Sequence, residues 1–301
     1  MLPKKLQDKI DARASDSSLR SLGLRQDLLD FSSNDYLGFS SSKKMYNKAC
    51  SVLKQHNYQV NGATGSRLLT ANHPLYLDTE KQIARFHNTP SALIFNSGYD
   101  ANIGFFSSVP QRGDVILYDA LCHASIRDGI AMSHAKGHKF AHNNLQGLEA
   151  LLEAQNTPGK IRPEIYVVTE AVFSMDGDSP ALKELANLCK KYSAYLIVDQ
   201  AHATGVIGPK GKGLVQELVL EDLVFARIVT FGKALGCHGA AILGSCELKS
   251  YLINFARSFI YTTALPPHTL ATIGAAYSEL EHNSDAIKKL QDNISTLQKC
   301  I

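Results

Sequence analysis

Hydrophobic and polar positions alternate in two different ways along this chain. From about residue 75, short apolar runs bounded by turn residues predict strands at 92–95, 115–118, 165–169, 195–199, 227–231 and 240–243. Longer stretches between them repeat apolar residues at helical spacing, and they predict helices at 75–87, 125–134, 145–155 and 181–192. This alternation predicts an α/β fold with a mostly parallel sheet that helices cover on both faces.

The two ends of the chain follow the helical pattern. Leu2, Leu6 and Ile10 lie on one face of an expected N-terminal packing helix, and Asp8 and Asp11 argue against a transit peptide. Residues 278–300 also predict a helix, and the chain stops inside it. We therefore expect an N-terminal arm at 1–45, a large domain at 46–277, and the start of an incomplete small domain at 278–301.

Composition excludes several classes of protein. The chain has 301 residues, of which 45% are hydrophobic, and its net charge of +3 is spread without blocks, so we expect no nucleic-acid partner. Its six cysteines form no CxxC pair, which indicates free thiols in a reducing cytoplasm. No apolar run approaches the length of a membrane span, so we also expect no membrane association.

In such sheets, ligands bind and reactions take place at the carboxyl ends of the strands. The first predicted strand runs into Asn96-Ser97-Gly98-Tyr99-Asp100 and then a helix. A glycine turn before a helix offers free N–H groups and the positive end of the helix dipole, which suit a phosphate. Many such turns bind nothing, and neither GxGxxG nor GxxxxGK[ST] occurs, so this signal is weak alone.

Two further strand ends carry ionisable residues. Asp199 closes an apolar strand and could be a helix cap, an ion-pair partner or a metal ligand, but no further ligand has suitable spacing, so we expect no metal. His202 follows, either as a packing residue or as part of a site. Lys233 lies in a glycine-flanked apolar stretch. Burial in such a place lowers the pKa of a lysine and makes its amine available as a nucleophile. Together they suggest that Lys233 forms an imine with an aldehyde cofactor while Asp199 holds a pyridine nitrogen protonated.

His123, after the second strand, is equally a ring-stacking residue or an ordinary loop histidine.

Longer segments carry a resemblance to a known family. SSNDYLG at 32–38, TGSRL at 64–68 and TEAVFSMDGD at 169–178 occur in order with the Asp199 and Lys233 motifs. They resemble the α-oxoamine synthases, which are fold-type-I enzymes that use pyridoxal 5'-phosphate (PLP). These acyltransferases condense an amino acid with an acyl thioester and release CO2. The resemblance implies the aminotransferase class I/II fold, and it runs essentially from residue 2 to residue 277.

Three segments resemble one branch of that family. They are AHATG at 201–205, GKALGCHGAA at 232–241 and YTTALPP at 261–267. That branch condenses L-alanine with a pimeloyl thioester, of coenzyme A or of acyl carrier protein, in biotin biosynthesis. Two alternatives stay open: a sister synthase using glycine or serine, and a non-catalytic partner subunit on the same fold. Such a subunit should lack the imine lysine, and Lys233 is present.

The resemblance implies a role for each matching position. Lys233 corresponds to the Schiff-base lysine and proton-transfer base, Asp199 to the pyridinium partner, and His123 to the histidine stacked on the ring and touching substrate. Asn34 corresponds to a substrate contact. The other implied cofactor contacts are Gly98, Tyr99, Ser174, His202, Thr230, Thr262 and Thr263. The last two are expected to reach a phosphate across the interface of a homodimer with shared active sites.

Three departures from the family pattern are visible. Gln200 stands where an acid is usual, and we expect it to change a supporting bond rather than the chemistry. Ala71 occupies a position that is often glycine, with no consequence that we can derive. The family also continues into a C-terminal domain that supplies an arginine for the substrate carboxylate. Because the sequence ends at Ile301, we expect weak binding of that carboxylate.

Overall fold

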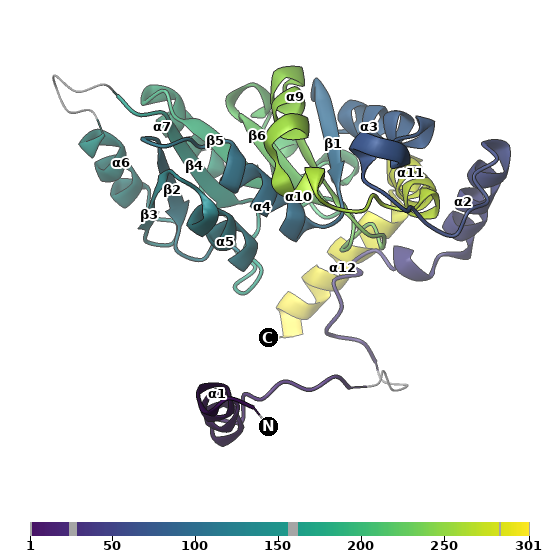
Figure 1. The fold of residues 1–301 in the computed structure, drawn as a ribbon, viewed down its shortest axis with the longest axis horizontal. Coiled ribbons are helices and arrows are strands. Elements are labelled where there is room, and N and C mark those ends of the chain that lie inside the picture. Colours follow the sequence, from purple (N-terminus) through teal and green to yellow (C-terminus); the bar gives the residue numbers. More distant parts are fainter. Residues whose placement is uncertain (1, 24–28, 156–161, 283, 301) are drawn as a thin grey trace. The chain divides into compact units, whose positions relative to one another are not determined.

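In the computed structural model, seven strands form one sheet in the order β1-β7-β6-β5-β4-β2-β3 (Figure 1). The strands are β1 (Ser91–Phe95), β2 (Val115–Asp119), β3 (Lys136–Phe140), β4 (Ile165–Glu170), β5 (Tyr195–Asp199), β6 (Ala226–Thr230) and β7 (Ala240–Gly244). Strands β3, β2, β4, β5 and β6 pair in parallel, and β7 is antiparallel to both β6 and β1. The carboxyl ends of β1, β2, β4, β5 and β6 therefore lie at one edge of the sheet.

The structure describes residues 2–23, 29–155, 162–282 and 284–300, and it divides into two units, Met1–Ser33 and Asn34–Ile301. The predicted α/β fold class is confirmed, and all six predicted strands form with ends within one residue of the prediction. Strand β3 was not predicted. Its first four residues, including Lys136 and Lys139, are exposed, so it has no apolar alternation to recognise.

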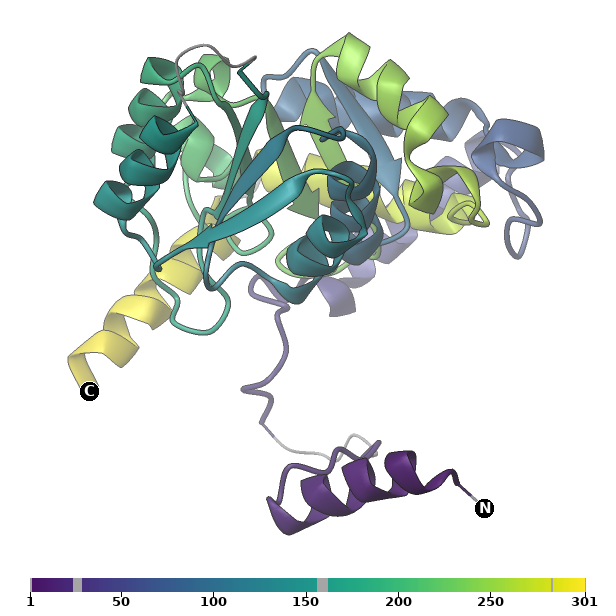
Figure 2. The same cartoon turned by 60° about the vertical axis from the view of Figure 1, so that its left-hand side comes forward.

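Helices cover both faces of the sheet (Figures 1 and 2). Because side chains alternate along a strand, Leu93 and Phe95 of β1 join one core cluster while Ala92 and Ile94 join another. The first cluster includes side chains of α4, α5, α9 and α10, and the second those of α2, α3 and α11. A third cluster packs α6 and α7 against β2, β4 and β5.

The helix bounds agree closely with the four helices predicted between the strands. The α-helices of the second unit are α2 (Lys43–Gln55), α3 (Pro74–Phe86), α4 (Gly98–Ser108), α5 (Ala124–Met132), α6 (Leu145–Ala154), α7 (Leu182–Lys191), α8 (Leu214–Glu217), α9 (Cys246–Phe255), α10 (Arg257–Ile260), α11 (Pro267–His282) and α12 (Asp285–Cys300). Single turns of other helical types lie at Phe39–Ser41, Arg67–Ala71, Pro209–Gly211 and Glu221–Leu223.

The first unit contains helix α1 (Lys4–Ser15), so the predicted N-terminal helix forms. Within its own unit α1 buries none of its residues, and its packing role stays a prediction. Leu2, Leu6 and Ile10 keep 50%, 48% and 39% of their surface exposed.

The single helix predicted at 278–300 is wrong in its bounds, because the region holds the end of α11 and the whole of α12. Ser284 is not helical, and its carbonyl accepts the N–H of Lys288, as expected for a residue that starts a new helix. Ala286 and Ile287 pack α12 against the cluster that contains α2, α3 and α11.

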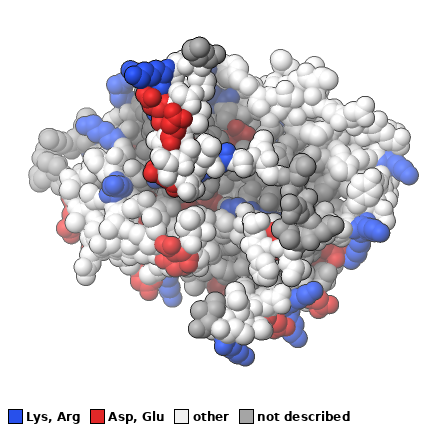
Figure 3. All heavy atoms as spheres, turned by 90° about the horizontal axis from the view of Figure 1, so that it is seen from below, with Lys and Arg blue, Asp and Glu red and all other residues white. Residues whose placement is uncertain are grey.

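Surface charge is mixed on the face drawn in Figure 3, where Lys and Arg side chains lie among Asp and Glu. Among the helices of the described residues, none combines the length and apolar character needed to cross a membrane.

Candidate active site

Lys233 lies three residues beyond the end of β6, in a turn where it is half-buried. Its Nζ is 2.6 Å from Nε2 of His202. Burial lowers the pKa of Lys233, and the negative charges of Asp199 and Glu170 act in the opposite direction. The amine is therefore deprotonated more easily than an exposed lysine, as a nucleophile or a proton-transfer base requires.

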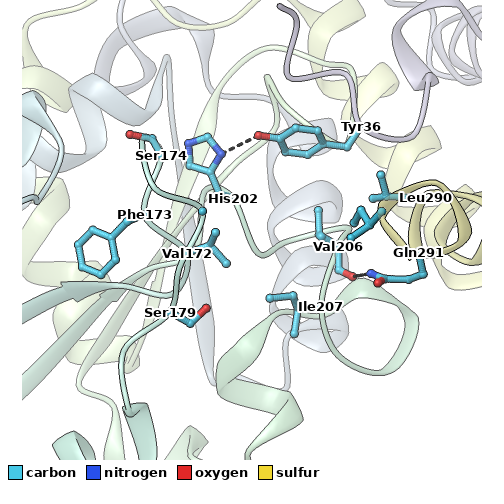
Figure 4. A pocket seen from close by; sticks show the side chains of 12 residues that line it. Tyr36, Val172, Phe173, Ser174, Ser179, His202, Val206, Ile207, Leu290 and Gln291 are labelled. Carbon is cyan, nitrogen blue, oxygen red and sulfur yellow. Dashed lines mark hydrogen bonds between the residues drawn. The ribbon is translucent and has the colours of Figure 1, made fainter. Parts of the chain in front are cut away.

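His202 connects Lys233 to Tyr36. Figure 4 shows the hydrogen bond between His202 and Tyr36. Burial, followed by the charge of Lys233, lowers the pKa of His202 to about 4, so the imidazole is neutral near pH 7. An ammonium group only donates, so Nε2 accepts from Lys233 and the ring proton lies on Nδ1. Nδ1 then donates to the Tyr36 hydroxyl at 2.7 Å, and that hydroxyl donates to Oδ1 of the exposed Asn34 at 3.1 Å. These contacts form one directional chain from Lys233 to Asn34.

The segment that carries Tyr36 is held against the Lys233 turn by close backbone packing. Asp35 accepts the Ser40 hydroxyl at 2.5 Å, which fixes the turn after Tyr36. Gly236 has a φ of +61°, and a Cβ there would overlap the backbone nitrogen of Ser40. Glycine is thus required at position 236 for both its conformation and this approach.

Asp199 is the last residue of β5 and is 5% exposed. Oδ1 accepts the N–H of Ala201 at 2.9 Å, and Oδ2 accepts Nδ2 of Asn102 at 3.0 Å. The same Nδ2 donates to Oγ of Ser125 at 3.0 Å. Two donors thus hold the carboxylate in one orientation at the edge of the sheet, and Ser125 in turn fixes the Asn102 amide.

Glu170 closes β4 in register with Asp199 on β5. Its Oε1 accepts the N–H of His123 at 2.5 Å, and this bond fixes the start of α5. Burial, followed by the charge of Asp199, raises the pKa of Glu170. The Ser125 N–H donates to Nδ1 of His123 at 3.2 Å, so a neutral His123 carries its proton on Nε2.

The turn before α4 forms as predicted, with Ser97 as its N-cap. Ser97 Oγ accepts the N–H of Asp100 at 3.0 Å, which leaves the N–H groups of Gly98 and Tyr99 without a partner in the described part of the chain. Thr230 at the end of β6 lies next to Gly98. A Cβ atom added to Gly98 would be 3.8 Å from the Thr230 side chain. Free N–H groups and a hydroxyl therefore converge at a helix N-terminus.

These residues surround a cavity of about 200 Å³, which brings together six of the predicted positions. Its lining consists of Gly98, Tyr99, Asn102, His123, Ser125, Glu170, Asp199, Ala201, Thr230 and Lys233.

The other predicted site residues lie around it or apart from it. Ser174 and His202 line a second cavity that adjoins the first through the contact between His202 and Lys233. Thr262 and Thr263 lie outside both cavities, where Asn96 Nδ2 donates to Thr262 Oγ1 at 2.9 Å and to the Thr263 carbonyl at 2.7 Å.

Sequence reasoning missed three residues that support the site. Glu170 could have been found as an acid that closes an apolar strand, the same signal that identified Asp199. Asn102 is an amide on a helix that is otherwise apolar toward the core and is 2% exposed. Tyr36 carries no local signal, because only folding brings it to His202.

Gln200 is fully buried, and its Oε1 accepts the N–H of Val215 at 3.0 Å, which is a supporting bond to α8.

The fold and the arrangement of the site define a class of protein, the fold-type-I transferases with a lysine at the end of a central strand. The chain belongs to the aminotransferase class I and II family, which matches residues 26–299. It is 47% identical over 265 residues to an 8-amino-7-oxononanoate synthase of Emericella nidulans, covering 84% of this chain and 64% of that protein. The chain thus spans less than two thirds of the length of that relative.

Two solved structures have the same fold. An 8-amino-7-oxononanoate synthase from Francisella tularensis is 32% identical with a TM-score of 0.74, covering 89% of this chain and 74% of that chain. A serine palmitoyltransferase from S. paucimobilis, solved with PLP and myriocin, is 25% identical with a TM-score of 0.85, covering 96% and 75%. The resemblance to the α-oxoamine synthases and the fold-type-I architecture are confirmed.

Proposed function

We propose that the protein uses PLP to condense L-alanine with a pimeloyl thioester, releasing CO2 and forming 8-amino-7-oxononanoate. The observation that carries this proposal is that Lys233, Asp199 and His123, at the carboxyl ends of β6, β5 and β2, line one cavity. The similarity to 8-amino-7-oxononanoate synthases supports the choice of substrates.

The residues present fit PLP. Lys233 offers an amine for its aldehyde, Asp199 a carboxylate for its pyridine nitrogen, and the N–H groups of Gly98 and Tyr99 an anion site for its phosphate. The buried Oδ1 of Asn102 has no partner in the described contacts, which leaves an acceptor free toward a bound group. When bound, PLP supplies an electron sink for the charge that develops on the amino acid.

Lys233 and Asp199 divide the chemical work. Lys233 removes and returns the proton at the α-carbon of the amino acid, and its lowered pKa suits it to both steps. Asp199 supplies a negative charge to the cavity that it lines, where it would favour a protonated pyridine nitrogen. Asn102 and Ala201 hold that carboxylate in place, so no reorganisation is needed during reaction.

Two histidines position the reacting groups. His123, held through its backbone by Glu170 and through its ring by Ser125, lines the cavity and orients substrate over the cofactor site. His202 holds the amine of Lys233 at 2.6 Å, and together with Ser174 it would help to hold PLP. Thr230 and the start of α4 bind the phosphate. Asn34 contacts the amino-acid substrate.

The active unit is a homodimer with shared sites. Thr262 and Thr263 lie outside the cavity of their own chain, and Asn96 fixes them through two hydrogen bonds. In a two-fold dimer they reach the phosphate site of the second copy.

A sister reaction with serine is the second candidate. The serine palmitoyltransferase structure superposes with a TM-score of 0.85, against 0.74 for the synthase from Francisella tularensis. The higher sequence identity to the latter, 32% against 25%, favours alanine.

The test is a comparison of amine substrates. PLP-loaded protein is incubated with pimeloyl thioester of coenzyme A or of acyl carrier protein and with L-alanine, glycine or L-serine, and products are identified by mass spectrometry. We expect 8-amino-7-oxononanoate and CO2 in equal amounts, with kcat/KM highest for L-alanine. A higher kcat/KM for glycine or serine would assign the sister reaction, and no product with any amine would refute the proposal.

A further inference from the structure

Glu170 lines the same cavity as Lys233 and Asp199 but exchanges no proton in the proposed reaction. It is the last residue of β4 and is 3% exposed. A carboxylate in such a place loses its hydration, and this loss is costly unless donors or a positive charge replace the water. The protonation state of Glu170 therefore determines the charge of the cavity.

A second carboxyl group lies beside it. Glu170 and Asp199 are paired in the register of β4 and β5. Paired residues of adjacent strands project from the same face of a sheet, and both side chains line one cavity. Two negative charges repel each other in a poorly hydrated space, so the pair retains a proton that two separate carboxyl groups would lose.

Hydrogen bonds determine which member of the pair keeps this proton. Both oxygens of Asp199 accept a hydrogen bond, at 2.9 Å from the Ala201 N–H and at 3.0 Å from Asn102 Nδ2, and these donors stabilise its charged form. Among the described contacts of Glu170, Oε1 accepts the N–H of His123 at 2.5 Å, whereas Oε2 accepts from no donor. The proton therefore belongs on Oε2 of Glu170.

The charges around Glu170 agree with this assignment. Burial, followed by the negative charge of Asp199, raises the pKa of Glu170 to about 8. The His123 N–H and the charge of Lys233 oppose this increase but do not cancel it. The titratable neighbours of Glu170, which come from β2, β5 and β6 or the turns after them, are Asp119, Cys122, His123, Asp199 and Lys233.

The charge of Glu170 acts on the reactive amine. Burial lowers the pKa of Lys233, and negative charges on Asp199 and Glu170 raise it. An ionised Glu170 would keep the amine protonated up to a higher pH, whereas a neutral Glu170 leaves only Asp199 to oppose burial. Oε1 of Glu170 can accept the N–H of His123 in either state. A neutral Glu170 thus positions His123 without keeping Lys233 protonated.

We propose that Glu170 is the neutral, proton-holding member of a carboxyl pair with Asp199, and that it positions His123 while Asp199 alone is negatively charged. This role rests on the proposed function, because there Lys233 moves the proton of the substrate and His123 orients the substrate. Ionisation of Glu170 at alkaline pH would add a second negative charge and lower turnover.

Infrared spectroscopy detects the proton without requiring a reaction. PLP-loaded protein at pH 7 should show the C=O stretch of a protonated carboxyl group, and this band should disappear by pH 10. Glu170→Gln should lack the band at pH 7, whereas Glu184→Gln, at an exposed position of α7, should retain it. An equal band in Glu170→Gln and in the unmodified protein, or no band in either, would overturn the proposal.

The proton also links folding to pH. Because the folded-state pKa of Glu170 lies above the unfolded value of about 4.3, its contribution to stability is full below that value and is lost as pH rises to about 8. The unfolding equilibrium constant of the unmodified protein, divided by that of Glu170→Gln, should rise about tenfold for each pH unit between pH 5 and pH 8. Denaturant unfolding at a fixed PLP concentration measures this ratio. The ratio to Glu184→Gln should stay level, and a level ratio to Glu170→Gln would contradict the proposal.

Kinetics test the positioning role. Glu170→Gln keeps an oxygen that can accept the His123 N–H and Glu170→Ala does not, so kcat/KM for L-alanine at pH 7 should be about two- to tenfold higher in Glu170→Gln. From pH 7 to pH 9 the unmodified protein should lose more activity than Glu170→Gln. Equal kcat/KM in the two variants would refute the positioning of His123, and equal alkaline losses would refute the action on Lys233.

The infrared and unfolding measurements decide the proposal even if Glu170→Ala does not fold, because they need only Glu170→Gln and its control. They also separate this proposal from the proposed function. A protein that shows the protonated carboxyl group but forms no 8-amino-7-oxononanoate would refute the proposed function alone.

Discussion

The hydroxyl of Tyr36 lies 2.7 Å from Nδ1 of His202, although 166 residues separate them in the chain. Nδ1 donates in this contact, which matches the tautomer in which Nε2 of His202 accepts a hydrogen bond from Lys233. A residue remote in the sequence thereby supports the orientation in which Nε2 of the imidazole faces the reactive amine.

Replacing Tyr36 by Phe should slow turnover without removing the cofactor. The ring keeps its packing while His202 loses one neutral hydrogen bond, so we expect kcat to fall about two- to tenfold. Absorbance of bound PLP reports that the cavity is intact. Tyr46→Phe, at an exposed position of α2, should leave kcat unchanged. A Tyr36→Phe enzyme with normal kcat would show that the contact has no role in turnover.

Borohydride treatment of PLP-loaded protein should attach the cofactor permanently to a single peptide that contains Lys233. Lys233 is the described lysine that lines the cavity with Asp199, so Lys233→Ala should abolish both the attachment and turnover. Peptide mapping by mass spectrometry gives the site. Lys190→Ala on α7 should behave as the unmodified protein, and attachment elsewhere would contradict the assignment.

Asp199→Asn should lower turnover by two or more orders of magnitude while PLP stays bound. The amide has nearly the same shape but no charge, and losing a key electrostatic partner often costs several kcal/mol in the transition state. Steady-state kinetics with L-alanine measures the effect. The control Asp222→Asn removes an exposed carboxylate outside the cavity. Near-normal kinetics in Asp199→Asn would leave Asp199 with a structural role only.

His142 should make the protein more stable at pH 6 than at pH 9. Burial lowers its pKa, but hydrogen bonds to Asp119 at 2.8 Å and Asp178 at 2.9 Å outweigh burial, so the pKa is raised. A raised folded-state pKa gives stability that is full below the unfolded value of about 6.5 and is lost as pH rises through the folded value. Denaturant unfolding measures the free energy of unfolding of His142→Gln and of the unmodified protein. The difference between the two should narrow between pH 6 and pH 9. His134→Gln, at an exposed position, should show no such gap.

Mixing two inactive variants should restore activity if the sites are shared. One copy carries Lys233→Ala, and the other carries Thr262→Val together with Thr263→Val. A mixed dimer contains one site with native lysine and native threonines, so random exchange should recover about a quarter of the unmodified activity. Light scattering should give the mass of a dimer. A monomer, or no recovery after subunit exchange, would contradict shared sites.

Much of this fold could be predicted from the sequence because six of its strands are buried and apolar. Their ends fixed where Gly98, Asp199 and Lys233 would lie, since parallel strands finish at a common edge. Strand β3 was not predicted, because an exposed edge strand needs no apolar pattern.

Tertiary contacts explain what the sequence could not supply. The chain from Lys233 through His202 to Tyr36 depends on the backbone approach of Ser40 to Gly236, which no local pattern encodes. The break between α11 and α12 was missed, although Ser284 followed by Asp285 is a common signal for the start of a helix. The second cavity depends on the position of α12, which the hydrogen bond from Gln291 to the Val206 carbonyl helps to fix.

The two edges of the sheet differ in a way that bears on aggregation. Strand β1 is buried along its whole length, whereas β3 is an open edge with Lys136, His138 and Lys139 exposed. An open edge can recruit a strand from another molecule during synthesis, and lysines there oppose such addition because two copies would bring like charges together. Neutralising both lysines, for example by acetylation or by exchange for threonine, would therefore reduce the yield of soluble protein at high concentration before it affected catalysis.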